Sequence, residues 1–140
     1  MANCCSDSVV FYSFDNNEAV KKFAEDIENY FEPRKLSECW FGGFLSEKGI
    51  DVSGFSIRGT LIYYEAEETN VLIDVESAWH PLLEAYKVLA KLYNLNFVVK
   101  AEEPGFEIYI NTDVEGNFFA ERYVAHVSDF NSKNSITLLF

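Results

Sequence analysis

The part of the chain that most resembles an active site is a junction formed by Trp79, His80 and Pro81. They lie where a strand-like segment, 70–77, passes into a helix-like segment. A histidine at such a junction can serve as a base or as a ligand. Proline is also favoured in the first turn of a helix for conformational reasons alone. We therefore interpret Trp79 as a core residue, His80 as solvent-facing and Pro81 as the start of the helix.

Cys39 is the second residue considered for chemistry. Its thiol would need a base such as His80 or His126, with an acid such as Asp74 to orient the imidazole. No local signature joins these residues, and free cysteines often act as small buried hydrophobes. We predict no catalytic residues and expect the protein not to be an enzyme. If a pocket exists, it is expected to involve Cys39, Trp40, Trp79 and His80.

A metal site is also not expected. The chain has three cysteines, and two of them, Cys4 and Cys5, are adjacent. Zinc motifs usually separate their cysteines by about two to four residues. The odd number does not fit a disulfide framework. We predict no metal and no cofactor.

The net charge limits the classes of partner that the chain is expected to bind. The 140 residues include 23 acidic and 11 basic residues, giving a formal net charge of −12. Such a chain repels phosphate backbones and anionic membranes, so we predict no direct nucleic-acid binding and no membrane association. A basic or nucleic-acid-binding protein is the natural partner. The acids predicted to form its binding surface are Glu65, Glu67, Glu68, Asp74, Glu76, Glu102 and Glu103.

The elements that position these residues follow from periodicity. Residues 8–14 are apolar and β-branched or aromatic, as expected of a strand. Asp15 and Glu18 then form a capping-box-like pattern before a helix that ends at Pro33. Residues 33–54 mix aromatics with four glycines and are expected to form a loop over the core or a short irregular strand.

The second half of the chain repeats this alternation of strand and helix. Segments 55–68 and 70–77 predict two strands joined by a turn, and a second helix begins near Pro81. Strands are predicted at 96–103, 106–112 and 117–127. The order is β-α-β-β-α-β with extra C-terminal antiparallel strands. It predicts one ferredoxin-like α+β domain over residues 1–140, with two helices on one face of the sheet. A different pairing of the central hairpin is the alternative.

Several short stretches resemble the YubB-type ferredoxin-like domain family. The stretches are "MANCCSDSVVFYSF", "ESAWHPLLEAYKVLAKLY" and "EEPGFEIYIN", and the matching positions are Asn3, Cys5, Ala78, Trp79, Pro81 and Gly105. The chain departs from the family at Cys4, where a tryptophan is common, and at Leu82, where a second proline is common. The resemblance implies a ferredoxin-like fold, an origin in bacteria, phage, plasmid or other mobile DNA, and no known catalytic activity.

Function is expected to be non-enzymatic binding of a protein partner, for instance to inhibit a nucleic-acid-directed host defence such as CRISPR or restriction. A small enzyme or ligand-binding domain, with its pocket near Trp79, His80 and the 39–45 loop, is the alternative. A third hypothesis is a homo-oligomer, suggested by the broad apolar surface of the second helix and by the "ITLLF" end. With no signal peptide or membrane span in the sequence, a cytoplasmic location is expected.

Overall fold

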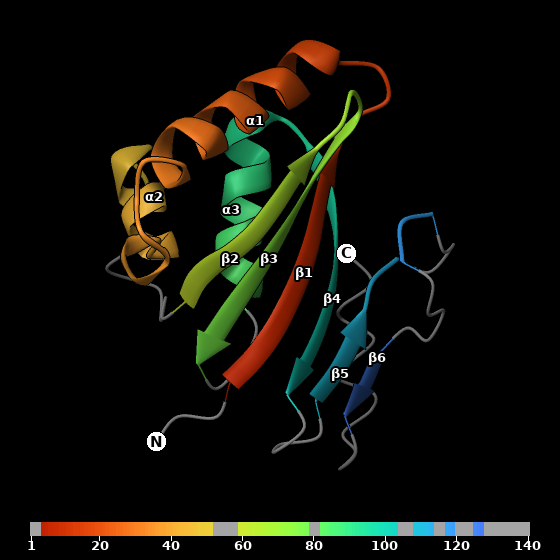
Figure 1. Cartoon of the computed structure of the whole chain (residues 1–140). Coiled ribbons are helices and arrows are strands. Elements are labelled where there is room, and N and C mark those ends of the chain that lie inside the picture. Colours follow the sequence, from red (N-terminus) through yellow and green to blue (C-terminus); the bar gives the residue numbers. More distant parts are fainter. Residues whose placement is uncertain are drawn as a thin grey trace.

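The computed structural model describes residues 4–51, 59–78, 82–103, 108–113, 117–119 and 125–127. Within these residues the chain forms a six-stranded antiparallel sheet with helices packed against it (Figure 1). The predicted α+β class is therefore confirmed.

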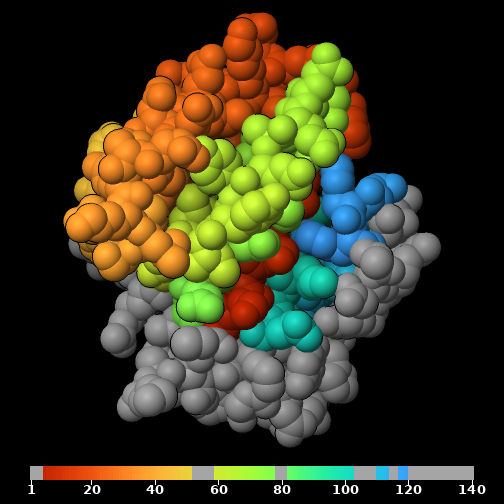
Figure 2. Space-filling view, in the orientation of Figure 1, coloured from red at the N-terminus to blue at the C-terminus, as the bar shows by residue number. Residues whose placement is uncertain are grey.

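The described elements run along the chain as β1 (Cys4–Tyr12), α1 (Asn17–Phe31), the short 3-10 helix η1 (Leu36–Glu38), α2 (Phe41–Glu47), β2 (Gly59–Ala66), β3 (Asn70–Ala78), α3 (Leu83–Tyr93), β4 (Asn96–Glu103), β5 (Ile108–Asn111) and β6 (Ala125–Val127). Across the sheet the order is β2-β3-β1-β4-β5-β6, and each neighbouring pair is antiparallel. β2 is thus one edge of this sheet, and it lies at the surface beside the residues that follow α1 (Figure 2). The additional strands, β5 and β6, continue the sheet beyond β4.

Helix α1 begins one residue later than the sequence predicts. The Asn16 side chain accepts a hydrogen bond from the backbone N–H of Ala19, so Asn16 is the N-cap. Asp15, the predicted cap, instead accepts a bond from the Ser13 hydroxyl. The helix ends at Phe31, two residues before Pro33, which cannot continue an α-helix.

Helix α3 has one exposed apolar residue in its last turn. Ala85, Tyr86, Leu89 and Ala90 are buried against the sheet, whereas Leu92 is 50% exposed. Asn94 ends the helix in the left-handed conformation, with φ 58°, a position where asparagine is tolerated. The apolar surface that motivated the homo-oligomer hypothesis is therefore mostly core.

Helix α2 was not predicted. Phe41, Phe44 and Leu45 lie on one face of it and are fully buried, which is the spacing of a helix. Gly42 lowers the helix propensity of the segment. A Cβ on Gly42 would lie 2.7 Å from a ring carbon of Trp40, so this glycine allows the indole to pack closely on the helix. The sequence predicted two helices on one face of the sheet, and α2 is an additional helix.

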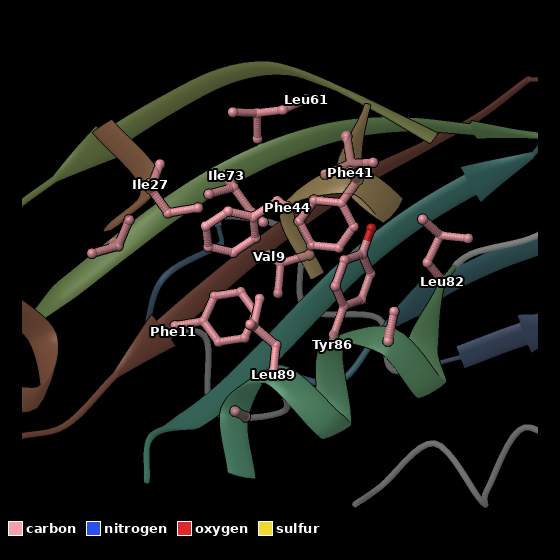
Figure 3. Packing of buried hydrophobic residues seen from close by; sticks show 14 of the residues in the cluster. Val9, Phe11, Ile27, Phe41, Phe44, Leu61, Ile73, Leu82, Tyr86 and Leu89 are labelled. Carbon is pink, nitrogen blue, oxygen red and sulfur yellow. The ribbon is translucent and has the colours of Figure 1, made fainter. Parts of the chain in front are cut away.

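One face of the sheet carries the core (Figure 3). Side chains alternate along β1, so Val9 and Phe11 point to the helices, together with Ile73 of β3. The Phe11 ring lies 4.8 Å from that of Phe23 in α1 and 6.5 Å from that of Tyr86 in α3. Each fully buried side chain of this size contributes about 1.5–3 kcal/mol, so this layer fixes how the sheet and the helices sit.

The opposite face is covered in part by residues 117–119. The Phe118 ring lies 5.0 Å from that of Tyr12, and the Lys100 ammonium lies over the Phe119 ring at 5.7 Å. The buried carboxylate of Asp113 holds this segment, since it accepts backbone N–H bonds from Asn117, Phe118 and Phe119. The face of the sheet opposite the helices is therefore partly covered.

Candidate functional site

A groove of about 500 Å³ runs along the outer edge of β2. The end of α1 and η1 form one wall, and β2 forms the other; the two walls lie side by side in Figure 2. Its lining includes Arg34, Leu36 and Cys39 on the helical side and Leu61, Ile62 and Tyr64 on the strand side. The groove is open to solvent along its length, so it suits a segment of another molecule.

Exposed apolar side chains gather at this groove. Six large hydrophobic residues are exposed in the described part of the chain. Three of them line the groove: Leu36 (59%), Ile62 (44%) and Tyr63 (50%). Leaving such side chains in water costs free energy that burial would recover. Contiguous exposed apolar surface is typical of an interaction site. We call these three residues the apolar corner.

Polar contacts fix the walls of the groove. Arg34 lies over the Tyr30 ring at 3.8 Å and donates a hydrogen bond to the Tyr30 carbonyl. Its guanidinium also pairs with Glu47 at 3.9 Å. On the other wall, the Tyr64 hydroxyl donates to Glu32 at 2.5 Å. Burial, followed by the bond to Glu32, holds the pKa of Tyr64 well above its usual value.

Cys39 is not placed as a nucleophile by these contacts. Its thiol donates to the carbonyls of Lys35, at 3.3 Å, and of Phe31, at 3.8 Å. Burial raises the pKa of the Cys39 thiol, with Arg34 opposing this effect. The thiol is therefore protonated at neutral pH, whereas the thiolate is the reactive form. Trp40 lies next to Cys39, and Trp79 and His80 of the predicted pocket lie outside the described residues.

The predicted acidic surface divides into two groups. Glu65, Glu67 and Glu68 are exposed at and beside the β2–β3 turn. The second group is on β3 and β4, where Glu76 and Glu102 both pair with Ser6 across the sheet. Asp74 belongs to this group, and its carboxylate accepts from the Ser8 hydroxyl at 2.8 Å.

Members of the two groups share the face of the sheet that lies away from the core. Glu65 pairs with Leu72, and Asp74 and Glu76 are two and four residues farther along β3. At about 3.3 Å per residue, Asp74 is about 7 Å and Glu76 about 13 Å along β3 from the position opposite Glu65. None of these acids lines the groove. The side chain of Glu103 lies outside the described part of the chain.

A buried polar cluster surrounds Asp7, which is 1% exposed. Its carboxylate accepts hydrogen bonds from the Tyr86 hydroxyl at 2.6 Å, the Leu82 backbone N–H at 3.2 Å and the Cys5 thiol at 3.2 Å. The Ser77 hydroxyl also donates to it at 3.4 Å. Burial raises the pKa of Asp7 from 3.8 to about 6, although these four donors act in the opposite direction.

The Asp7 cluster ties β1 to the start of α3. Leu82 is the N-cap residue of α3, so the carboxylate lies at the positive end of the helix. Asp7 was not among the predicted site residues, because the first strand was predicted to begin at Ser8. Period-two alternation from Phe11 through Val9 back to Cys5 would have placed Asp7 on the buried face. Each partner of the carboxylate is itself buried, which assigns the cluster to stability.

Metal and membrane chemistry find no support in the described residues. In that part of the chain no group of three or more histidine, cysteine, aspartate or glutamate residues could hold a metal ion. Its helices are also all too short or too polar to span a membrane. No family model, curated protein or solved structure matches the chain. The case for function therefore depends on the groove alone.

Proposed function

We propose that this protein is a non-enzymatic, acidic interaction protein that binds a basic partner protein at the groove beside β2. The observation that carries the proposal is the apolar corner, which places three of the six exposed large hydrophobic residues of the described chain in one groove. Stable interfaces combine an apolar centre with a polar rim. Two exposed acids supply an acidic rim: Glu32, which lines the groove, and Glu38 of η1.

Charge supports a basic partner. The chain carries a net charge of −12, and like charge on a partner would oppose association. Arg34, the basic residue in the groove, is already engaged by Glu47 and by the Tyr30 carbonyl. The identity of the partner, including a component of a nucleic-acid-directed host defence, stays a prediction.

We also propose a ferredoxin-like assignment for β1 to β4 with α1 and α3. The order β2-β3-β1-β4, with antiparallel pairing and one helix after each of β1 and β3, supports it. In this assignment η1 and α2 are an insertion before β2, and β5 and β6 are an extension. A cytoplasmic location is proposed as well, and the free thiols of Cys5 and Cys39 support it.

The test compares two variants with the same substitution. Leu36→Ser removes an apolar side chain from the groove, and Leu92→Ser removes one of similar exposure from α3, outside the apolar corner. Proteins that the immobilised wild-type chain captures at low salt are identified, and their affinities for wild type and for both variants are measured. We expect at least one captured protein to bind Leu92→Ser as tightly as wild type and to bind Leu36→Ser about tenfold more weakly.

Two results would contradict the proposal. One is that both variants lose the partner equally, which would place binding elsewhere. The other is that no captured protein distinguishes Leu36→Ser from wild type. Raising the salt concentration should weaken the specific complex, because the acidic rim is exposed to screening.

A further inference from the structure

The outer edge of β2 has an unpaired stretch. The Leu61 N–H donates to the Cys39 carbonyl at 3.0 Å, and Trp40 forms a β-bridge with Thr60. The register of β2 then shifts between Leu61 and Tyr63, as a β-bulge does. Beyond this shift, no strand of the described chain pairs with the outer edge. Cys39 and Trp40 thus pair with the first part of this edge, and the described chain leaves the rest of the edge unpaired.

The hydrogen-bonding groups of this edge that the described chain leaves unpaired can be assigned. The Glu67 N–H donates to the Asn70 carbonyl at 2.7 Å, so Glu67 faces β3. In an antiparallel ladder, alternate residues direct both N–H and C=O to the same side. Tyr64 and Ala66 therefore direct theirs to the outer edge. An edge with free donors and acceptors accepts a further strand.

Side chains on the two faces of β2 differ in chemistry. Leu61 and Tyr64 pair with Val75 and Ile73 on the core side, where the groove opens. Glu65 pairs with Leu72 on the other face. A strand laid along β2 would therefore place one set of side chains in the apolar groove. Its alternate set would lie beside Glu65 on the acidic side.

We propose, on the basis of the function above, that the partner binds by strand addition: a short extended segment with alternating apolar and basic residues pairs with the outer edge of β2. The apolar residues occupy the groove beside Leu36, and the basic residues lie opposite Glu65. Backbone bonds to Tyr64 and Ala66 supply affinity, and the alternation supplies specificity. A second copy of this chain is disfavoured as the occupant, because it would bring Glu65 against Glu65 between two chains of net charge −12 each.

The probe is a fluorescent, end-capped peptide of alternating valine and lysine, titrated against the full chain by anisotropy. Two further peptides are N-methylated, one on the valines and one on the lysines. In a strand these two sets of N–H groups point to opposite edges. We expect one of the two methylated peptides to lose at least about tenfold in affinity and the other to bind like the parent. The set of N–H groups whose methylation weakens binding shows whether the added strand runs parallel or antiparallel to β2.

Protein variants locate the site. Glu65→Gln should weaken the parent peptide by up to about fivefold, as expected for a cross-strand charge pair. Glu18→Gln, the same change in the first turn of α1, should have no effect. Equal binding of both methylated peptides would overturn strand addition, and so would no binding of any peptide. The proposed function would then still be judged separately, by the comparison of Leu36→Ser with Leu92→Ser.

Discussion

Asp7 should make the fold less stable as the pH rises, opposite to the usual effect of a buried, hydrogen-bonded carboxylate. Its pKa is raised from 3.8 to about 6 because burial outweighs its four donors. Between these two values the folded chain binds more protons than the unfolded chain. The free energy of unfolding therefore falls with rising pH. The contribution of Asp7 is fully present below pH 3.8 and is lost as the pH rises through about 6.

The magnitude follows from the two pKa values. At about 1.36 kcal/mol for each unit of pKa, the rise corresponds to about 3 kcal/mol. Asp7→Asn keeps the shape of the side chain and cannot ionise. Relative to wild type, the unfolding free energy of this variant should increase by about 3 kcal/mol between about pH 3.5 and about pH 7.5. Asp7→Ala should instead destabilise by about 3 kcal/mol or more, because it leaves the Tyr86 hydroxyl and the Leu82 N–H without their acceptor.

The assay is urea unfolding followed by circular dichroism at a series of pH values, with linear extrapolation for each. Glu76→Gln is the matched control, since it removes one exposed carboxylate from the neighbouring strand and does not touch the cluster. Its unfolding free energy should follow the wild-type pH profile. A difference between Asp7→Asn and wild type that does not change with pH would refute the reasoning, and so would a difference that shifts in favour of wild type as the pH rises.

Two further expectations test the packing around the groove and the core. Gly42→Ala should lower the unfolding free energy by about 1–3 kcal/mol, although alanine is the better helix former, because its Cβ meets the Trp40 ring; thermal unfolding measures this, and a stabilised variant would contradict the packing. Tyr93→Phe removes the hydroxyl that donates to Asp26 at 2.5 Å and should cost about 1.5–3 kcal/mol at neutral pH. The pKa of Asp26 is lowered by the Tyr93 bond, with Lys22 and Lys48 helping against the opposing effect of burial. The loss should therefore shrink as the pH falls and Asp26 is protonated, and a loss that stays constant in acid would contradict it.

Periodicity made the regular elements predictable. The apolar run of β-branched and aromatic residues at 8–14 predicts a strand, and the helical spacing from Val20 to Phe31 follows from burial of one face. Both signals act on each element separately. The predicted strands at 70–77 and 96–103 differ from β3 and β4 by one residue or less at each end. Helix α2 depends instead on tertiary contacts. Its glycines oppose helix formation locally, while Trp40 packs on the backbone that they leave bare.

The candidate site was predicted only in fragments. Cys39 and Trp40 were named for a pocket, and Glu65 and Glu67 for an acidic surface, but nothing in the sequence joined the two sets. Of these residues Cys39 lines the groove, opposite Leu61, because η1 lies against β2, and a contact between elements so far apart in sequence leaves no periodic signal. The same holds for Leu36 and Ile62. Each is an ordinary apolar residue in the sequence, and only the packing leaves it exposed.

A simpler role for the acidic residues near β2 is to protect this edge strand from pairing with other chains. Charged side chains and bulges keep sheet edges from pairing with other copies, and β2 has both, in Glu65 and in the register shift after Leu61. Protection alone, however, would favour a polar edge throughout. Leu36 and Ile62 instead expose apolar surface on both walls of the groove. An edge that repels its own copies by charge, yet keeps an apolar groove beside backbone groups that the described chain leaves unpaired, is what the proposed addition of a basic strand requires.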